Sequence, residues 1–107
     1  MRTIKFRAWD SDLDLMMPEV DLSTALQHYK WLGRKDLPIM QFTGLFDKNG
    51  REIYEGDVVR EEHNSRYEVV FEEGRFQKKC NSGLYVLQNT HYQEILGNIY
   101  QNPELIN

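Results

Sequence analysis

The chain has 107 residues and a formal net charge of −4 at pH 7, from 13 Lys and Arg against 17 Asp and Glu. Its single cysteine excludes a disulfide framework. No apolar run approaches the roughly 18 residues of a membrane helix, and the N-terminal segment lacks the apolar core of a signal peptide. The negative charge argues against sequence-independent binding to nucleic acid, which depends on neutralising phosphates. We therefore expect one small cytoplasmic domain without membrane contact.

The N-terminal third is expected to begin with a hairpin. Residues 4–9 alternate apolar and polar side chains, which predicts a half-buried strand with Trp9 opposite Ile4. Residues 10–14 are rich in Asp and Ser and predict a turn, and residues 15–17 predict a short return strand. In residues 19–37 we expect one short helix, because Ser23 suits an N-cap, Gly33 suits a C-cap, and apolar residues between them have helical spacing.

The middle of the chain predicts strands joined by tight turns. Residues 39–46 and 51–54 are expected to pair antiparallel around the turn 47–50. In that turn Gly50 takes a left-handed position, and Asp47 bonds the backbone ahead of it. Gly56 is expected to fold a corner before a strand over residues 58–61.

The second half of the chain continues this pattern. Residues 66–72 form the most regular strand, with Tyr67, Val69 and Phe71 expected in the core. Further strands are predicted over residues 75–77, 84–87 and 95–100. Short strands spaced roughly 8–12 residues apart are typical of a sandwich or barrel. We predict a mainly β fold (or α+β with one short helix) as a single domain. It would hold a small, SH3-like, partly open barrel over residues ~50–100 and an N-terminal β lobe, with possible sub-lobes 1–46 and 47–107.

Three segments together resemble the YopX family. They are IKFRAWD at residues 4–10, the runs MQFTGL, DKNG and EIYEGDVV between residues 40 and 59, and ILGNIYQNPEL at residues 95–105. Because these runs lie at both ends and in the middle, the resemblance covers essentially the whole chain. It departs at Phe46, where relatives usually carry a polar or basic residue, and over residues 17–38.

The resemblance implies a small cytosolic protein of a bacteriophage or prophage, with a mostly β, barrel-like fold. The family has no established biochemical activity, so the resemblance supplies no catalytic residues. The motif Tyr54-Glu55-Gly56-Asp57 is interpreted as structural, as are Asp47 and Gly50. In this interpretation Gly56 folds the corner and the Asp57 carboxylate accepts backbone N–H groups. The alternative makes Asp57 a site residue.

Metal binding and nucleophilic catalysis receive little support from the sequence. The possible soft ligands are scattered: His28, His63, His91 and Cys80. A structural zinc site needs four ligands, usually in close pairs. Cys80 follows two lysines, which favour a thiolate if they lie nearby, but no nucleophile motif accompanies it. We expect no catalytic residues, no metal and no cofactor.

Charge is unevenly distributed along the chain. Residues 55–73 carry seven acidic and two basic side chains, which indicates a solvated acidic face, or alternatively an acidic docking surface. Basic residues gather with aromatic ones in two places: Lys30, Arg34 and Lys35 with Trp31, and Arg75, Lys78 and Lys79 with Phe76 and Tyr85. Such groups can bind single-stranded nucleic acid, although these aromatic residues more often belong to a core.

The favoured function is therefore a non-enzymatic interaction module that binds a host or phage protein or associates with itself. An accessory nucleic-acid-binding module is the alternative. The candidate interaction surface comprises Trp9, Phe46, Arg75, Lys78 and Lys79. The two aromatic residues belong to it if both are exposed, whereas packing of the lobes would bury them.

Overall fold

The structure, a computed structural model, describes residues 4–20, 38–88 and 92–106. Contacts divide the chain into two compact units, Met1–Phe42 and Thr43–Asn107. The described residues form nine strands and two short 3₁₀ turns, and none of them is α-helical. The short helix expected within residues 19–37 falls on residues 21–37, which lie outside the described residues.

The first unit contains a β-hairpin. β1 (Phe6–Asp10) pairs antiparallel with β2 (Leu15–Met17), so that Trp9 lies opposite Met16. Asp10 shapes the turn between them, because one carboxylate oxygen accepts the N–H groups of Asp12 (3.0 Å) and Leu13 (3.1 Å). β1 also pairs with the start of β3 (Ile39–Phe46), and the order of this sheet is β2-β1-β3-β4. The predicted hairpin is confirmed.

Burial along β1 differs from simple alternation. Ala8 and Trp9 are neighbours in the chain and point to opposite faces, yet they are 0% and 6% exposed. Both faces of the strand are therefore covered at this end. Ile4, expected to point to the core, is 66% exposed because it precedes β1. Because Trp9 is buried, the condition under which it would belong to the interaction surface is not met.

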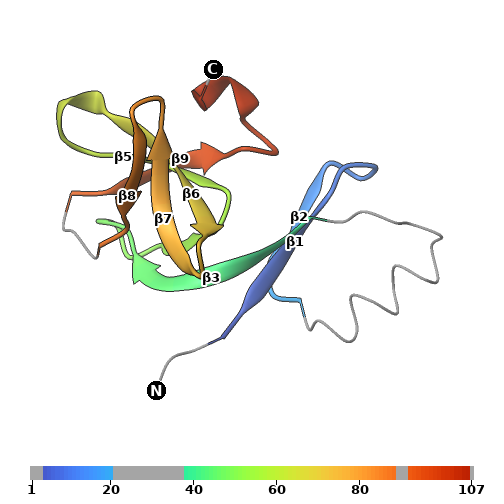
Figure 1. Ribbon diagram of the computed structural model, residues 1–107. Helices are drawn as coiled ribbons and strands as arrows, with labels where there is room; N and C mark the ends of the chain where they lie inside the picture. The colour runs from blue at the N-terminus through green and yellow to red at the C-terminus, as the bar shows by residue number, and fades with distance from the viewer. Residues whose placement is uncertain (1–3, 21–37, 89–91, 107) are drawn as a thin grey trace. The chain divides into compact units, whose positions relative to one another are not determined.

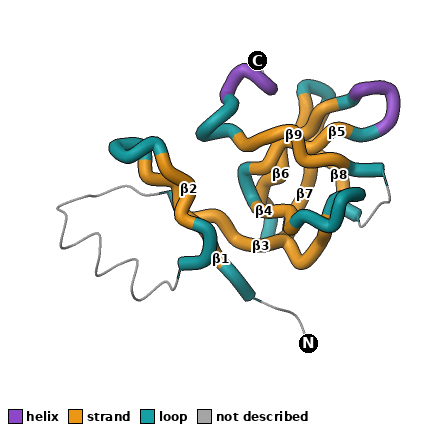
Figure 2. Tube along the Cα trace, turned by 180° about the vertical axis from the view of Figure 1, so that it is seen from behind, coloured by secondary structure: helices purple, strands orange, loops and turns teal. Residues whose placement is uncertain are grey.

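The second unit is built around one curled sheet (Figure 1). Its five strands have the order β8-β7-β6-β5-β9. They are β5 (Asp57–Arg60), β6 (Arg66–Glu72), β7 (Arg75–Cys80), β8 (Gly83–Val86) and β9 (Glu94–Asn98). The end of β3 and β4 (Glu52–Tyr54) complete the unit. The helical turns η1 (Glu62–Asn64) and η2 (Pro103–Ile106) follow β5 and β9 (Figure 2).

The core of this unit collects apolar side chains from β4, β5, β6 and β9. Ile53, Val59 and Val69 are fully buried, and Leu87 and Ile95 join them. Leu45, Tyr67 and Phe76 pack around this cluster. A curled sheet that does not close, wrapped around one core, is a partly open barrel. The prediction of a mainly β fold with such a barrel in residues ~50–100 and a further β lobe is confirmed. Within the described residues, no helix is long and apolar enough to cross a membrane.

Phe71 departs from its predicted burial. It lies on the same face of β6 as Tyr67 and Val69, but its side chain is 46% exposed. Its partner in the ladder is Phe76, one step from the end of the β6–β7 hairpin, and the two rings make an edge contact at 5.0 Å. The position is thus at the rim of the core. Val70, expected on the outer face, is 9% exposed.

Gly97 on β9 lies against the side chains of Asn102 and Leu105. A Cβ atom built there would lie 2.8 Å from Cγ of Asn102 and 2.9 Å from Cδ1 of Leu105. We expect Gly97→Ala to lower the free energy of unfolding by about 1–3 kcal/mol, because the side chains of Asn102 and Leu105 must shift to make room for the methyl group. Urea denaturation measures this change. Glu104→Ala, at an exposed position of η2, serves as the control, and equal stability of the two variants would contradict the expectation.

Candidate interaction surface

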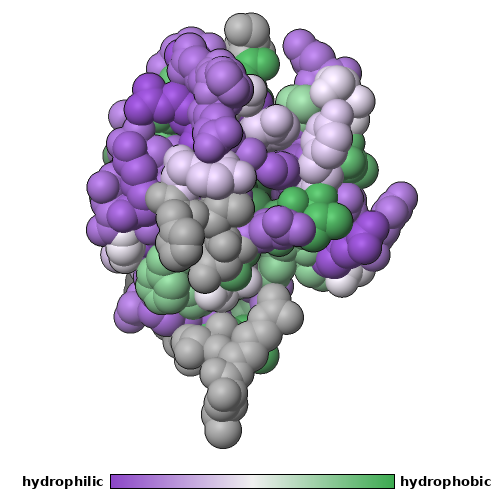
Figure 3. All heavy atoms as spheres, turned by 90° about the vertical axis from the view of Figure 1, so that its left-hand side faces the viewer, coloured by the Kyte–Doolittle hydropathy of each residue, from purple (hydrophilic) through white to green (hydrophobic). Residues whose placement is uncertain are grey.

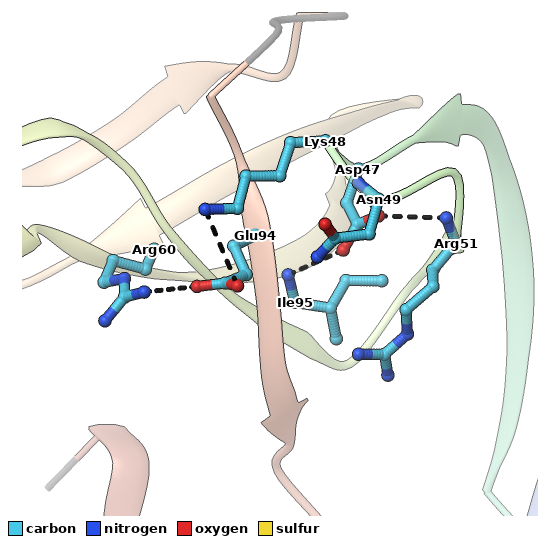
Figure 4. A network of polar contacts seen from close by, with 7 residues as sticks. All are labelled: Asp47, Lys48, Asn49, Arg51, Arg60, Glu94 and Ile95. Atoms are coloured by element: carbon cyan, nitrogen blue, oxygen red, sulfur yellow. Dashed lines mark hydrogen bonds and ion pairs between the residues drawn. The ribbon is translucent and has the colours of Figure 1, made fainter.

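Asp47 anchors the turn between β3 and β4 (Figure 4). Oδ1 accepts the N–H groups of Asn49 and Arg51, both at 2.9 Å. Oδ2 accepts the N–H of Ile95 on β9 at 3.1 Å. Gly50 completes the turn with a φ of +80° and donates its N–H to the Asp47 carbonyl. The carboxylate therefore holds a local turn and attaches that turn to a strand far along the chain.

The ionisation of Asp47 reflects these contacts. Its side chain is buried, with 5% of the residue exposed, and burial by itself raises the pKa of a carboxyl. The N–H donors of Arg51, Ile95 and Asn49, together with the charge of Arg51, outweigh burial and lower the pKa of Asp47 below its ordinary value. Asp47 thus acts as a permanently charged hydrogen-bond acceptor at neutral pH.

A second polar group lies beside this turn. Glu94 forms ion pairs with Arg60 on β5 and with Lys48, the latter at 3.7 Å. All three side chains are partly exposed, and exposed pairs contribute little to stability, about 0–1 kcal/mol each. The Arg60–Glu94 pair joins β5 to β9 at the surface.

The motif Tyr54-Glu55-Gly56-Asp57 forms the corner between β4 and β5. Gly56 has a φ of +89°, which glycine adopts without strain. Its N–H donates to Val69 and its carbonyl accepts the N–H of Ile99. Asp57 is 2% exposed, and its Oδ2 accepts the N–H of Tyr54 at 2.8 Å. Each of these contacts serves the backbone of the barrel.

A buried polar cluster occupies the core side of the barrel. Nζ of Lys78 lies 2.8 and 2.7 Å from the two carboxylate oxygens of Glu61, and 4.9 Å from the centre of the Tyr67 ring. The Gln93 amide donates to Oε2 of Glu61 at 3.1 Å. Glu61 and Lys78 side chains are only 10% and 17% exposed, and Gln93 is 0% exposed. The expected solvated acidic face over residues 55–73 therefore does not include Glu61, nor Asp57, which accepts a backbone N–H as its motif predicts.

Cys80 ends β7 in a short chain of hydrogen bonds. Its Sγ lies 3.0 Å from the Ser82 hydroxyl, which lies 2.9 Å from the Tyr85 hydroxyl. The hydrogen bonds with Ser82 lower the pKa of the thiol, and Lys78 adds to this effect. A hydroxyl is not a general base, so these contacts do not form the nucleophile–base pair of a cysteine enzyme. Among the described residues, no group of three or more His, Cys, Asp or Glu side chains is placed to hold a metal ion.

β8 forms one edge of the five-stranded sheet of the barrel. β8 is the last strand of its sheet, with β7 on one side, and no strand in the described part of the chain pairs with its other side. All four residues are exposed, with exposed fractions of 37% at Leu84, 43% at Tyr85 and 53% at Val86. The strand is protected by its shortness, with four residues, but it carries neither charge nor proline, two other features with which proteins protect a sheet edge.

The residues expected to form an interaction surface are only partly accessible. Phe46 is 46% exposed, and Arg75 and Lys79 are exposed. Lys78 points toward the core and is paired with Glu61, and Lys79 lies 3.9 Å from Glu72. The visible face in Figure 3 is mainly hydrophilic, with hydrophobic atoms in separate patches. The predicted set thus includes two side chains, Trp9 and Lys78, that the fold places inward.

Sequence reasoning missed the features that define the barrel's edge and interior. Gln93 had no signal, because an isolated glutamine is usually exposed. Glu61 has no signal of its own either, because it belongs to a run of acidic residues in the sequence. The β8 edge did have a signal: Gly83-Leu84-Tyr85-Val86 is an uncharged stretch in a chain with 28% charged residues.

Comparisons with known proteins concern the family and the fold. The family model described as "YopX protein" matches residues 5–107. The crystal structure of protein EF1440 from Enterococcus faecalis is similar with a TM-score of 0.72 and 25% sequence identity, over 100% of both chains. The crystal structure of protein yopX from Bacillus subtilis is similar in fold, with a TM-score of 0.55 and 21% identity, again over 100% of both chains. No curated protein matches the chain.

Proposed function

The chain belongs to the YopX family, and on this premise we propose that it is a non-enzymatic protein-interaction module of phage or prophage origin that works in the bacterial cytoplasm. Its contact element is the open edge of β8. One side of β8 pairs with β7 and belongs to the barrel. The backbone groups on its other side pair with no strand in the described part of the chain.

The observation that carries this proposal is the combination of an unpaired strand edge with three consecutive exposed apolar side chains. A partner in extended conformation can add a strand to such an edge. The backbone hydrogen bonds then supply affinity, and alternate side chains supply specificity. The burial of Leu84 and Val86 by the added strand would stabilise the complex further.

Charge pairing supports a protein partner over a nucleic acid. Binding to phosphates needs several unpaired cations. Of the three basic residues on β7, Lys78 is held by Glu61 and Lys79 lies near Glu72, which leaves the exposed Arg75. Phe76 packs against the core and is not placed to stack on bases. The basic group at residues 30–35 lies outside the described residues.

Selection of displayed random peptides tests this proposal. We expect the wild-type protein to enrich extended peptides with alternating apolar residues. Val86→Pro should abolish the enrichment, because proline removes an outward N–H without a cost to the β7–β8 ladder. Tyr92→Ala, an exposed aromatic residue outside any strand, is the control and should behave as wild type. Failure of the wild type to enrich any peptide, or equal enrichment by Val86→Pro, would contradict the proposal.

A further inference from the structure

We propose that the strand added to β8 is β8 of a second copy, paired antiparallel about a two-fold axis that passes beside Tyr85. This inference deepens the proposed function and rests on it. Two five-stranded sheets would then join into one continuous sheet through their uncharged edges.

The direction of the backbone groups of β8 follows from its pairing with β7. The register joins Cys80 with Gly83, Lys79 with Leu84, Lys78 with Tyr85, and Gln77 with Val86. Cys80 and Gly83 flank a two-residue turn and therefore form a hydrogen-bonded pair, and such pairs alternate along an antiparallel ladder. Gly83 and Tyr85 thus direct their N–H and C=O groups toward β7. Leu84 and Val86 direct theirs to the open edge.

Symmetry restricts how two copies of this edge can meet. A two-fold axis perpendicular to a sheet places one residue opposite its own copy. With Tyr85 at the axis, Leu84 of each copy lies opposite Val86 of the other. Both residues point their backbone groups outward, so each of these two pairs exchanges two hydrogen bonds. This register satisfies all four outward groups of Leu84 and Val86 in each copy.

The side chains fit the same register. Leu84 and Val86 lie on the face of the sheet opposite Tyr85, together with Lys79 and the buried Gln77. Across the two strands, Leu84 of one copy and Val86 of the other would form apolar cross-strand pairs. Tyr85 lies on the core face, where its ring makes an edge contact with Tyr67 at 6.2 Å. The two Tyr85 rings would meet at the axis and extend this aromatic cluster across the interface.

Charge favours an identical partner. Two copies of a charged edge oppose like charges to each other, which is destabilising, whereas Gly83–Val86 has no charge to oppose. The nearest lysines are paired within their own chain: Lys78 with Glu61, and Lys79 with Glu72. A different partner selected by complementary charge would find no charge on this strand to recognise.

Disulfide trapping tests the register. In a Cys80→Ser background, Tyr85→Cys places two thiols in a non-hydrogen-bonded pair whose Cα atoms lie about 4.5 Å apart, within the range that a disulfide spans. Leu84→Cys is the matched control. In this register the two residues 84 are offset by two positions along neighbouring strands, so their Cα atoms lie more than about 7 Å apart, too far for a disulfide. Mild oxidation should yield covalent dimer for Tyr85→Cys and at least tenfold less for Leu84→Cys. The reverse preference would overturn this register.

Sedimentation over a range of protein concentrations tests the association itself. We expect a monomer–dimer equilibrium, which Val86→Lys should weaken at least tenfold by placing unpaired ammonium groups in the interface. Leu13→Lys, at a 64% exposed position in the β1–β2 turn, should leave it unchanged. A monomer at every concentration, or a dimer insensitive to Val86→Lys, would overturn the inference. Peptide enrichment by such a monomer would leave the proposed function standing, so the two failures are distinguishable.

Discussion

Replacing Glu61 by glutamine is expected to lower the free energy of unfolding by about 3 kcal/mol, as removal of one partner from a buried ion pair does. The change leaves the Lys78 ammonium without its counter-charge on the core side of the barrel, where only 17% of the lysine side chain reaches solvent. The change also replaces the charged oxygen of Glu61 that accepts the Gln93 side-chain N–H with an amide group. The other polar atom of the buried Gln93 side chain, Oε1, has no hydrogen-bond partner.

A double variant separates the cost of breaking the pair from the value of the pair. Glu61→Leu with Lys78→Met removes both charges and keeps similar volumes, and we expect it to recover most of the lost stability. Glu62→Gln, one residue away and exposed, is the matched control and should change the free energy of unfolding by less than about 0.5 kcal/mol. Denaturation by urea measures all variants. A Glu61→Gln protein as stable as the control would show that solvent reaches the lysine freely.

Replacing Asp47 by alanine should destabilise the protein by about 2–4 kcal/mol, because three backbone N–H groups lose a charged acceptor. Lys48→Ala removes only a partly exposed ion pair at the neighbouring position and should cost less than about 1 kcal/mol. Thermal denaturation monitored by circular dichroism compares the two. Similar midpoints for both variants would contradict the role assigned to the carboxylate.

The same carboxylate predicts a pH dependence with a definite sign. Its pKa is lower in the folded protein than the ordinary value of 3.8, so the unfolded chain binds the proton more readily. The stabilisation is fully present above that ordinary value and is lost as the pH falls through the lowered folded value. The stability difference between wild type and Asp47→Asn should therefore shrink below pH 3.8. A difference that stays constant to the lowest pH at which both proteins fold would contradict the lowered pKa.

The parts of the fold that the sequence predicts well are those decided by local chemistry. The strands over residues 39–46 and 66–72 and the turn at Asp47 and Gly50 depend on alternation and on turn residues within a few positions. The burial of Trp9, Glu61 and Gln93 depends on contacts with segments that are distant in the sequence. The Glu61–Gln93 hydrogen bond, for example, joins residues 32 positions apart, and no local pattern encodes it.

The contact surface was predicted less well than the fold for a related reason. Lysines and aromatic side chains in a sequence suggest exposed binding groups, but β7 turns Lys78 toward the core, and both faces of β1 are covered at Trp9. Conversely, the sequence at Leu84, Tyr85 and Val86 predicts a strand but does not indicate its position in the sheet. Only the order of strands in the sheet reveals that this strand lies at an edge.

The bond between Asp47 and Ile95 also has a consequence for the timing of folding. It spans 48 positions, and the neighbouring pair Arg60–Glu94 spans 34. During synthesis the turn at Asp47 and the hairpin of β5 and β6 leave the ribosome well before β9. The edge of β5 that pairs with β9 therefore remains unpaired until β9 has been synthesised. Such long-range pairing folds slowly and exposes strand edges in the interim. The nascent chain is therefore most vulnerable to aggregation and proteolysis shortly before its last strand arrives.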